Sequence, residues 1–164
     1  MSVPVPVPVL VLLLPLLLLA GCAASAAIQR PAVGVAHTRP AVEALALLHR
    51  WDGRRSAAYA AGDPSRLRRL YSRGSWAGAR DVRVLRAYAD RGLVVDGLAT
   101  QVLEVEVVER SGRVLRLRVV ERFAGGTVRS SRSEATLPSG RIRERVLTLV
   151  RGERGWVLRS VRPA

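Results

Sequence analysis

The pattern of apolar and polar positions changes twice along the chain. Residues 9–20 form an apolar run broken only by Pro15, residues 41–91 place apolar side chains three and four positions apart, and residues 100–162 alternate apolar with polar side chains. The first pattern is typical of a secretion signal, the second of amphipathic helices, and the third of strands with one buried face. The chain therefore predicts a leader followed by one folded domain.

Three helices are expected in the first part of that domain. The first covers residues 41–61, and its apolar face consists of Ala44, Leu48, Trp51, Ala58 and Tyr59. Asp63 is expected to cap a short second helix that begins at Pro64, because an aspartate accepts first-turn N–H groups and proline fits the first helical position. The third helix is expected over residues 79–91. Trp76, in the loop before it, is expected to be part of the core.

Five segments after residue 99 have the period of strands. They are residues 100–110, 113–123, 127–136, 141–150 and 156–162, separated by turn-forming pairs such as Ser111-Gly112 and Gly125-Gly126. In the first of them, Leu103 belongs to the expected inward face. Helices followed by a meander of four to six strands predict an α+β fold, with three N-terminal helices packed on one face of an antiparallel sheet.

The only cysteine of the 164 residues follows the apolar run, in the sequence Leu-Ala-Gly-Cys ending at Cys22. This segment resembles the lipobox of bacterial lipoproteins. The resemblance implies that the thiol of Cys22 is acylated, that a peptidase cleaves before it, and that the chain is held on the extracytoplasmic side of the cell membrane. Residues 1–22 are then the signal peptide, residues 23–40 a flexible tether, and residues 41–163 the folded domain.

Two alternatives to the lipoprotein interpretation stay open. The chain lacks the cation expected near the start of a signal, and its first ten residues contain a Val-Pro repeat. An uncleaved membrane helix or an ordinary cleaved signal with a chance cysteine would also place an apolar run here. The prolines of the run argue against a continuous helix.

The domain is strongly basic, since the formal net charge is +14 and all 27 basic residues are arginines. Such an excess favours anionic lipid headgroups or nucleic acid as partners. Export and the scarcity of aromatic residues argue against nucleic acid. A solvated, arginine-rich surface is the simpler interpretation.

The helical part of the domain resembles a known family. Trp51 and Tyr59, then Ala-Gly-Asp at 61–63, then Leu67, Leu70 and Tyr71, are similar to the opening of nuclear transport factor 2-like, or SnoaL-like, domains. More narrowly, the chain resembles uncharacterised actinobacterial lipoproteins that carry such a domain. The resemblance implies three helices followed by a strongly curved antiparallel sheet that encloses a cone-shaped pocket, and possible dimerisation through the open sheet face. Members include isomerases, cyclases and dehydratases as well as non-catalytic binding domains, so the fold does not select a function.

Six residues are candidates for the pocket. They are Trp51, Arg55, Tyr59, Tyr88, Glu121 and Glu144. Arg55 lies one helical turn after Trp51 and is suited to an anionic ligand. Glu121 and Glu144 share the strand parity of inward apolar residues, which makes them candidate buried acids. Packing, or pairing of each acid with an arginine, is the alternative role for these side chains.

The sequence favours a binding module over an enzyme. His37, in the tether, and His49, on the polar side of the first helix, have no acidic partner at a diagnostic spacing. We find no phosphate-binding loop and no metal-ligand spacing, so no cofactor or metal is expected. The expected function is non-catalytic binding of a small apolar or anionic ligand, or of an envelope protein. An isomerase, cyclase or dehydratase that uses a buried carboxylate is the alternative.

Overall fold

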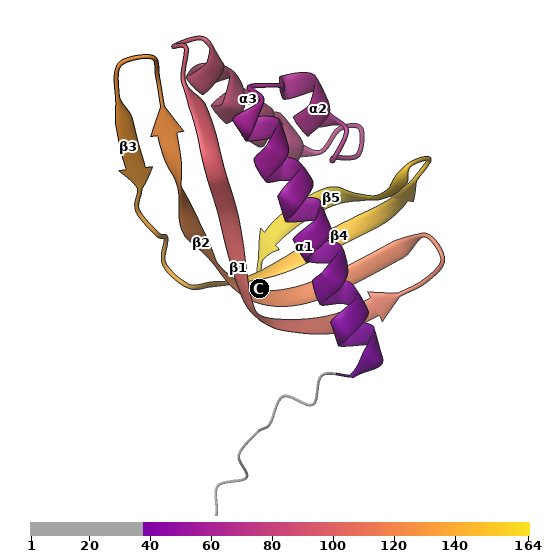
Figure 1. Cartoon of the computed structure of the whole chain (residues 1–164). Coiled ribbons are helices and arrows are strands. Elements are labelled where there is room, and N and C mark those ends of the chain that lie inside the picture. Colours follow the sequence, from indigo (N-terminus) through magenta and orange to yellow (C-terminus); the bar gives the residue numbers. More distant parts are fainter. Residues whose placement is uncertain (1–37) are drawn as a thin grey trace, which may run out of the picture. The chain divides into compact units, whose positions relative to one another are not determined.

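The computed structural model describes residues 38–164, so the predictions for the signal peptide, for Cys22 and for His37 lie outside the described residues. Three helices, α1 (Arg39–Ala60), α2 (Pro64–Arg68) and α3 (Trp76–Ala89), precede five strands (Figure 1). The strands are β1 (Val94–Arg110), β2 (Val114–Arg129), β3 (Glu134–Leu137), β4 (Arg143–Gly152) and β5 (Gly155–Pro163). This order confirms the predicted α+β class. Within residues 38–164 no helix is long and apolar enough to cross a membrane.

Local signals set the starts of the helices. The Oδ1 atom of Asp63 accepts the N–H groups of Ser65 and Arg66, both at 2.9 Å, which confirms the predicted cap of α2. Helix α1 begins at Arg39, so the last two residues of the expected tether are helical.

Helix α3 begins three residues earlier than predicted. The Ser75 hydroxyl accepts the N–H of Gly78 at 3.2 Å and so acts as the cap. The earlier start moves Trp76 from a loop to the first turn of the helix, where 69 % of its surface is exposed. The expectation that Trp76 is part of the core was therefore wrong.

The sheet is antiparallel and has the order β1-β2-β4-β5, with β3 also paired to β2. One edge of β2 pairs with β1, whereas its other edge pairs with β4 over residues 114–121 and with β3 over residues 126–129. Since two different strands use the two halves of one edge, the sheet separates into two arms. Figure 1 shows these arms curving around α1.

The predicted turn at Gly125-Gly126 is absent, because β2 continues through it. Gly125 has a φ of 117°, a conformation that glycine adopts without strain, so the strand bends here rather than reversing. The chain reverses after Arg129, where the N–H of Ser130 donates to the carbonyl of Ser133 at 2.8 Å. The expected strand over residues 127–136 is thus a hairpin made by the end of β2 and by β3.

A β-bulge corrects a second prediction. The β1–β2 register shifts between Val102 and Glu104, so Val102 and Val105 pack against the core. Leu103, which was expected to face inward, is 41 % exposed. An extra residue in one strand displaces all later side chains to the opposite face, and simple alternation cannot anticipate it.

One core joins the helices to the sheet. Its fully buried members include Tyr59, Leu67, Leu85, Val95, Leu117, Val119 and Leu149. The segment between α2 and α3 is fixed to β5: the N–H of Leu158 donates to the carbonyl of Leu70 at 2.9 Å, and the N–H of Ser72 donates to the carbonyl of Leu158 at 3.1 Å. This attachment holds α3 over the sheet at a distance that leaves a cavity.

Candidate functional site

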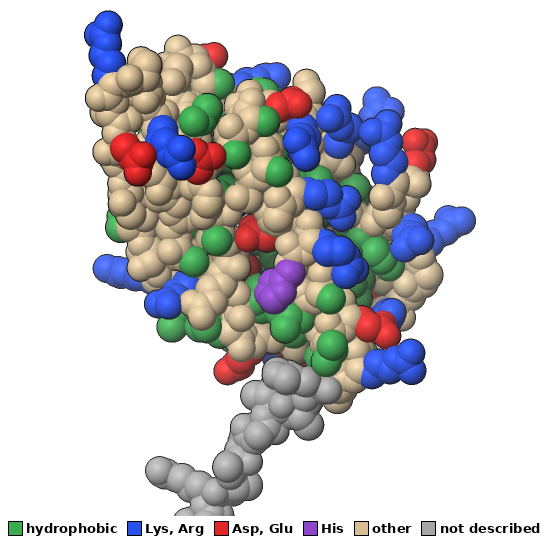
Figure 2. Space-filling model, viewed as in Figure 1, with side chains coloured by type: hydrophobic (Ala, Val, Ile, Leu, Met, Phe, Trp, Pro, Cys, Tyr) green, Lys and Arg blue, Asp and Glu red, His purple; other side chains and the backbone are tan. Residues whose placement is uncertain are grey.

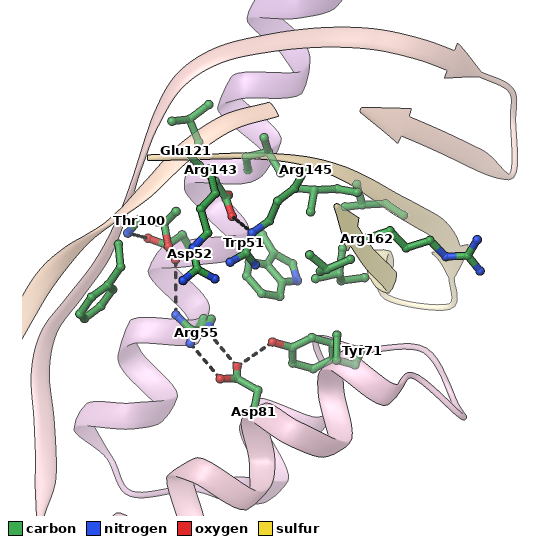
Figure 3. Close-up of a pocket in the computed structure, with 18 of the residues that line it drawn as sticks. Trp51, Asp52, Arg55, Tyr71, Asp81, Thr100, Glu121, Arg143, Arg145 and Arg162 are labelled. Atoms are coloured by element: carbon green, nitrogen blue, oxygen red, sulfur yellow. Dashed lines mark hydrogen bonds and ion pairs between the residues drawn. The ribbon is translucent and has the colours of Figure 1, made fainter. Parts of the chain in front are cut away.

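A cavity of about 850 Å³ lies between the helices and the inner face of the sheet. Helices α1 and α3, the segment around Tyr71, and strands β1, β2, β4 and β5 all contribute to its wall. Much of the wall is apolar and includes Leu48, Trp51, Val102, Phe123, Leu147, Leu149, Leu158 and Val161. Charged side chains project into the same space (Figure 3). The volume is within the usual range for small-molecule sites.

Asp81 organises the helical wall. Its carboxylate accepts a bidentate pair of hydrogen bonds from the Arg55 guanidinium, at 2.7 Å from Nε and 2.8 Å from Nη2. The hydroxyls of Tyr59 and Tyr71 donate to the same carboxylate at 2.8 Å and 2.6 Å. Three elements distant in sequence therefore meet at one buried anion.

The ionisation of this cluster follows from its geometry. Burial alone would raise the pKa of Asp81, but the hydrogen bonds and charge of Arg55 hold it below its usual value. Burial and the Asp81 carboxylate raise the pKa of both Tyr59 and Tyr71. Burial would lower the pKa of Arg55, and the Asp81 carboxylate outweighs that effect and raises it. At neutral pH the cluster therefore contains an ion pair between Arg55 and Asp81, together with the neutral phenol groups of Tyr59 and Tyr71.

Asp52 is a second acid in the wall. Its Oδ2 atom accepts the backbone N–H of Thr100 at 2.8 Å, which ties α1 to β1. Its Oδ1 atom is buried and has no hydrogen-bond partner among the described residues, and the nearest cation, Nη1 of Arg55, lies 4.0 Å away. Buried oxygens of native proteins usually accept a hydrogen bond. This atom is therefore an unsatisfied acceptor in the wall of the cavity.

Glu121 faces the cavity from β2, and its side chain is 15 % exposed. Burial raises the pKa of its carboxyl group, whereas Arg145 on β4, with Nε at 3.4 Å, lowers it in part, and the negative charge of Asp52 raises it further. A buried carboxyl with a raised pKa can exchange a proton with a ligand.

Arg143 and Arg162 bring positive charge that the wall does not neutralise. Within the described residues no carboxylate lies within 4.0 Å of either guanidinium. Figure 3 shows the side chain of Arg143 directed into the cavity, beside Asp52 and Arg55, and that of Arg162 extending from the rim. Since Arg55 and Arg145 are occupied by acids, Arg143 is the inward cation that is free to receive an anion.

The structure distributes the six predicted pocket residues unevenly. Trp51, Arg55 and Glu121 line the cavity. Tyr59 does not line it, because its ring is buried in the core and only its hydroxyl reaches Asp81. Tyr88 also lies outside the lining and packs against the core.

Glu144 borders the cavity, but it is not a buried acid. Its side chain is 52 % exposed and lies 3.7 Å from Arg118 on the solvent-facing side of the sheet. The neighbouring positions in β4 explain the error, because Leu147 and Leu149 are the buried residues and alternate side chains share a face. The inward face of β4 therefore contains Arg143 and Arg145.

Six charged residues of the cavity wall escaped sequence reasoning. They are Asp52, Arg80, Asp81, Arg143, Arg145 and Arg162. No local spacing in the sequence indicates that Arg55, Tyr71 and Asp81 meet in space. The alternation of side chains along β4 could have indicated Arg143 and Arg145, but the sequence analysis took the face that contains Glu144 as the inward one. His49 lines the cavity from an exposed position. Among the described residues, no group of three His, Cys, Asp or Glu side chains is placed to hold a metal ion.

Comparison with known proteins supports the fold. No protein-family model matches the sequence, and no curated protein matches it. The intermembrane space region of the chloroplast protein ARC6 superposes with a TM-score of 0.50 at 17 % identity, covering 75 % of this chain and 96 % of that one. At such an identity the similarity shows the fold alone.

Two further solved structures have lower scores. Aln2 from a Streptomyces species has a TM-score of 0.48 at 16 % identity, covering 74 % of this chain and 90 % of that one. An NTF-2 like protein of unknown function from Shewanella oneidensis has a TM-score of 0.44 at 14 % identity, covering 74 % and 96 %. The nuclear transport factor 2-like fold itself is evident from the three helices, the curved antiparallel sheet and the cavity between them.

Proposed function

We propose that this protein is a non-catalytic binding module whose cavity holds a small amphipathic molecule with an apolar body and one anionic group. The observation that carries the proposal is Arg143, a guanidinium directed into a largely apolar cavity without a carboxylate partner among the described residues. An arginine presents a planar fork of donors that matches a carboxylate, sulfonate or phosphate.

The other polar groups refine the expected ligand. The carboxylate of Asp52, whose side chain is 17 % exposed, would accept a hydrogen bond from a hydroxyl or amide of the ligand. The Arg55–Asp81 and Arg145–Glu121 pairs match two inward cations with two inward acids, so Arg143 and Asp52 are the inward charged groups left to meet a ligand. The preferred ligand is therefore a monoanion whose anionic group meets Arg143 and whose hydrogen-bond donor meets Asp52, and a polyanion would be disfavoured.

A pair of fluorescent probes tests this preference. 8-Anilinonaphthalene-1-sulfonate combines an aromatic body with a sulfonate, and N-phenyl-1-naphthylamine is its neutral counterpart. The full-length protein is expected to bind both and to bind the sulfonate more tightly. Arg143→Gln should weaken sulfonate binding by about 10- to 100-fold, since hydrogen bonds to charged groups contribute about 1.5–3 kcal/mol. Binding of the neutral probe should change little.

Arg141→Gln is the matched control for this experiment. Arg141 lies two residues away and is exposed, as Arg143 is, but it is not in the wall of the main cavity. Equal losses of sulfonate binding in the two variants would attribute the effect to overall charge and would refute the assignment of Arg143.

The proposal also includes the cellular location of the protein. The lipobox-like segment ending at Cys22 supports a lipid-anchored protein on the extracytoplasmic side of the cell membrane. Two or three acyl chains would hold it there, because each buried CH₂ contributes about 0.8 kcal/mol. Cys22→Ala is expected to release the protein into the soluble extract. An uncleaved, membrane-bound variant would instead indicate a helical anchor.

Glu121 favours a second candidate function, proton transfer to or from the bound ligand. Its carboxyl is nearly buried, faces the cavity and has a raised pKa because of burial, as general acids and bases require. Incubation of a bound ligand in D₂O would then introduce deuterium in the wild type and not in Glu121→Gln. Equal, uncatalysed exchange in both proteins would leave binding as the function.

A further inference from the structure

The outward face of α3 combines an exposed tryptophan with arginines. Trp76 is 69 % exposed, and the Arg80 guanidinium lies 5.7 Å from the centre of its ring. Arg83 and Val84 follow seven and eight residues after Trp76, so they share its side of the helix. Val84 is 41 % exposed. The buried residues of α3, which are Gly78, Val82 and Leu85, lie on the opposite side.

The surface charge of residues 64–92 is predominantly positive. Residues 64–92 contain eight arginines, all exposed: Arg66, Arg68, Arg69, Arg73, Arg80, Arg83, Arg86 and Arg91. The same residues include two acids, Asp81 and Asp90. Because the carboxylate of Asp81 is bound by Arg55 in the interior, Asp90 alone opposes the arginines at the surface. Figure 2 shows basic side chains gathered where Figure 1 places α2 and the segment after it.

We infer that this face, defined by Trp76, Arg80, Arg83 and Val84, docks on an anionic lipid bilayer. Tryptophan prefers the headgroup level of a membrane, because its ring is apolar and its N–H is polar. Each arginine near an anionic leaflet adds about 1 kcal/mol of attraction. Two large apolar side chains surrounded by arginines suit headgroups better than a protein interface, whose centre is depleted of charge.

Docking in this way would orient the cavity. Trp76, Arg80 and Val84 also belong to its wall, so the opening they border would face the headgroups. A molecule taken from the membrane could then enter without crossing bulk water. This consequence rests on the proposed function, whereas the docking itself does not.

The test follows the tryptophan of the full-length chain in lipid vesicles. Brominated acyl chains quench a tryptophan that reaches the interface. Wild-type emission should fall in brominated phosphatidylglycerol vesicles, and Trp76→Phe should lose that part of the quenching while Trp51 and Trp156 contribute as before. The quenching of Trp76 should be weaker in phosphatidylcholine vesicles or at high salt. Because any anchor is the same in both proteins, the difference reports the position of Trp76.

Two double variants of equal charge test the face. Arg80→Gln with Arg83→Gln should lower the ratio of docked to undocked protein about 30-fold, as expected for two headgroup contacts. Arg113→Gln with Arg132→Gln removes two exposed arginines from turns elsewhere and should leave the quenching of Trp76 unchanged.

Three results would overturn the inference. Equal quenching of the wild type and Trp76→Phe would show that Trp76 does not reach the bilayer, and equal losses in both double variants would show that only net charge matters. Protection of Trp76 by a second copy of the chain or by duplex DNA, without quenching by vesicles, would assign the face to that partner instead.

Discussion

Replacing Asp81 by alanine should destabilise the protein more than any exposed substitution in the same helix. The carboxylate accepts four hydrogen bonds from Arg55, Tyr59 and Tyr71, and the Arg55 and Asp81 side chains are 19 % and 12 % exposed. Asp81→Ala would leave a buried guanidinium and two hydroxyls without their acceptor. Removing one member of a buried ion pair costs about 3–5 kcal/mol, a large part of the total stability of a domain.

Urea unfolding followed by circular dichroism measures this loss, with Asp90→Ala, at the end of the same helix, as the exposed control. The control should change the free energy of unfolding by about 0.5 kcal/mol or less. The double variant Arg55→Met with Asp81→Ala should lose less than the sum of the single variants, because the two residues interact directly. A cost for Asp81→Ala within about 1 kcal/mol of the control would refute the view that this pair organises the helical wall.

The pH dependence of the same variant has a definite sign. The folded-state pKa of Asp81 is lower than the usual value of 3.8, so the ionised form is favoured by folding. Its contribution is therefore complete above about pH 4 and is lost as the pH falls through the folded-state pKa. The difference in stability between the wild type and Asp81→Ala should shrink in acid, and a difference that grows in acid would contradict the assignment.

Two further predictions concern the cavity wall and the packing behind it. Glu121 has a folded-state pKa above its usual value of 4.5, so the wild type should lose stability as the pH rises from 4.5 through that pKa. Thermal unfolding measured between about pH 4.5 and 7 should show this decline in the wild type and not in Glu121→Gln. A decline of equal size in both proteins would assign it to other groups. A Cβ at Gly78 would lie 2.5 Å from Cγ of Tyr71, whereas a Cβ at Gly53 would meet nothing within 4 Å. Gly78→Ala should therefore cost about 1–3 kcal/mol and Gly53→Ala should stabilise α1 by about 0.5–1 kcal/mol in urea unfolding, and similar effects in both would refute the close packing of Tyr71 on α3.

Much of the fold was predictable because local signals and periodicity determine it. The Asp63 cap, the turn after Arg110 and the final hairpin all depend on neighbouring residues, and the structure has them where the sequence placed them. The errors arose where tertiary pairing overrides local pattern. Gly125 and Gly126 bend a strand that stays paired on both sides, and the bulge at Leu103 reverses the faces of β1.

The site was harder to predict than the fold because its chemistry is non-local. Asp81 binds Arg55 and Tyr71, which lie 26 and 10 residues away in the sequence. The contact depends on the close approach of α3 to Tyr71 at Gly78, which has no side chain. In β4, apolar residues occupy both faces near Val146 and Leu147, so the alternation did not reveal that Arg143 and Arg145 point inward. The family resemblance predicted a cavity, whereas the distribution of charged side chains in its wall became evident only from the three-dimensional structure.

Native mass spectrometry of the full-length protein, purified from its own membrane, would reveal whether the cavity holds an anionic amphipathic molecule. We expect the wild type and Arg141→Gln to retain a small anionic molecule, Arg143→Gln to lose most of it, and the released molecule to contain an apolar body and a single acidic group. Retention of the same molecule to the same extent by all three proteins would contradict the role of Arg143, and a retained cation or polyanion would contradict the proposed ligand class.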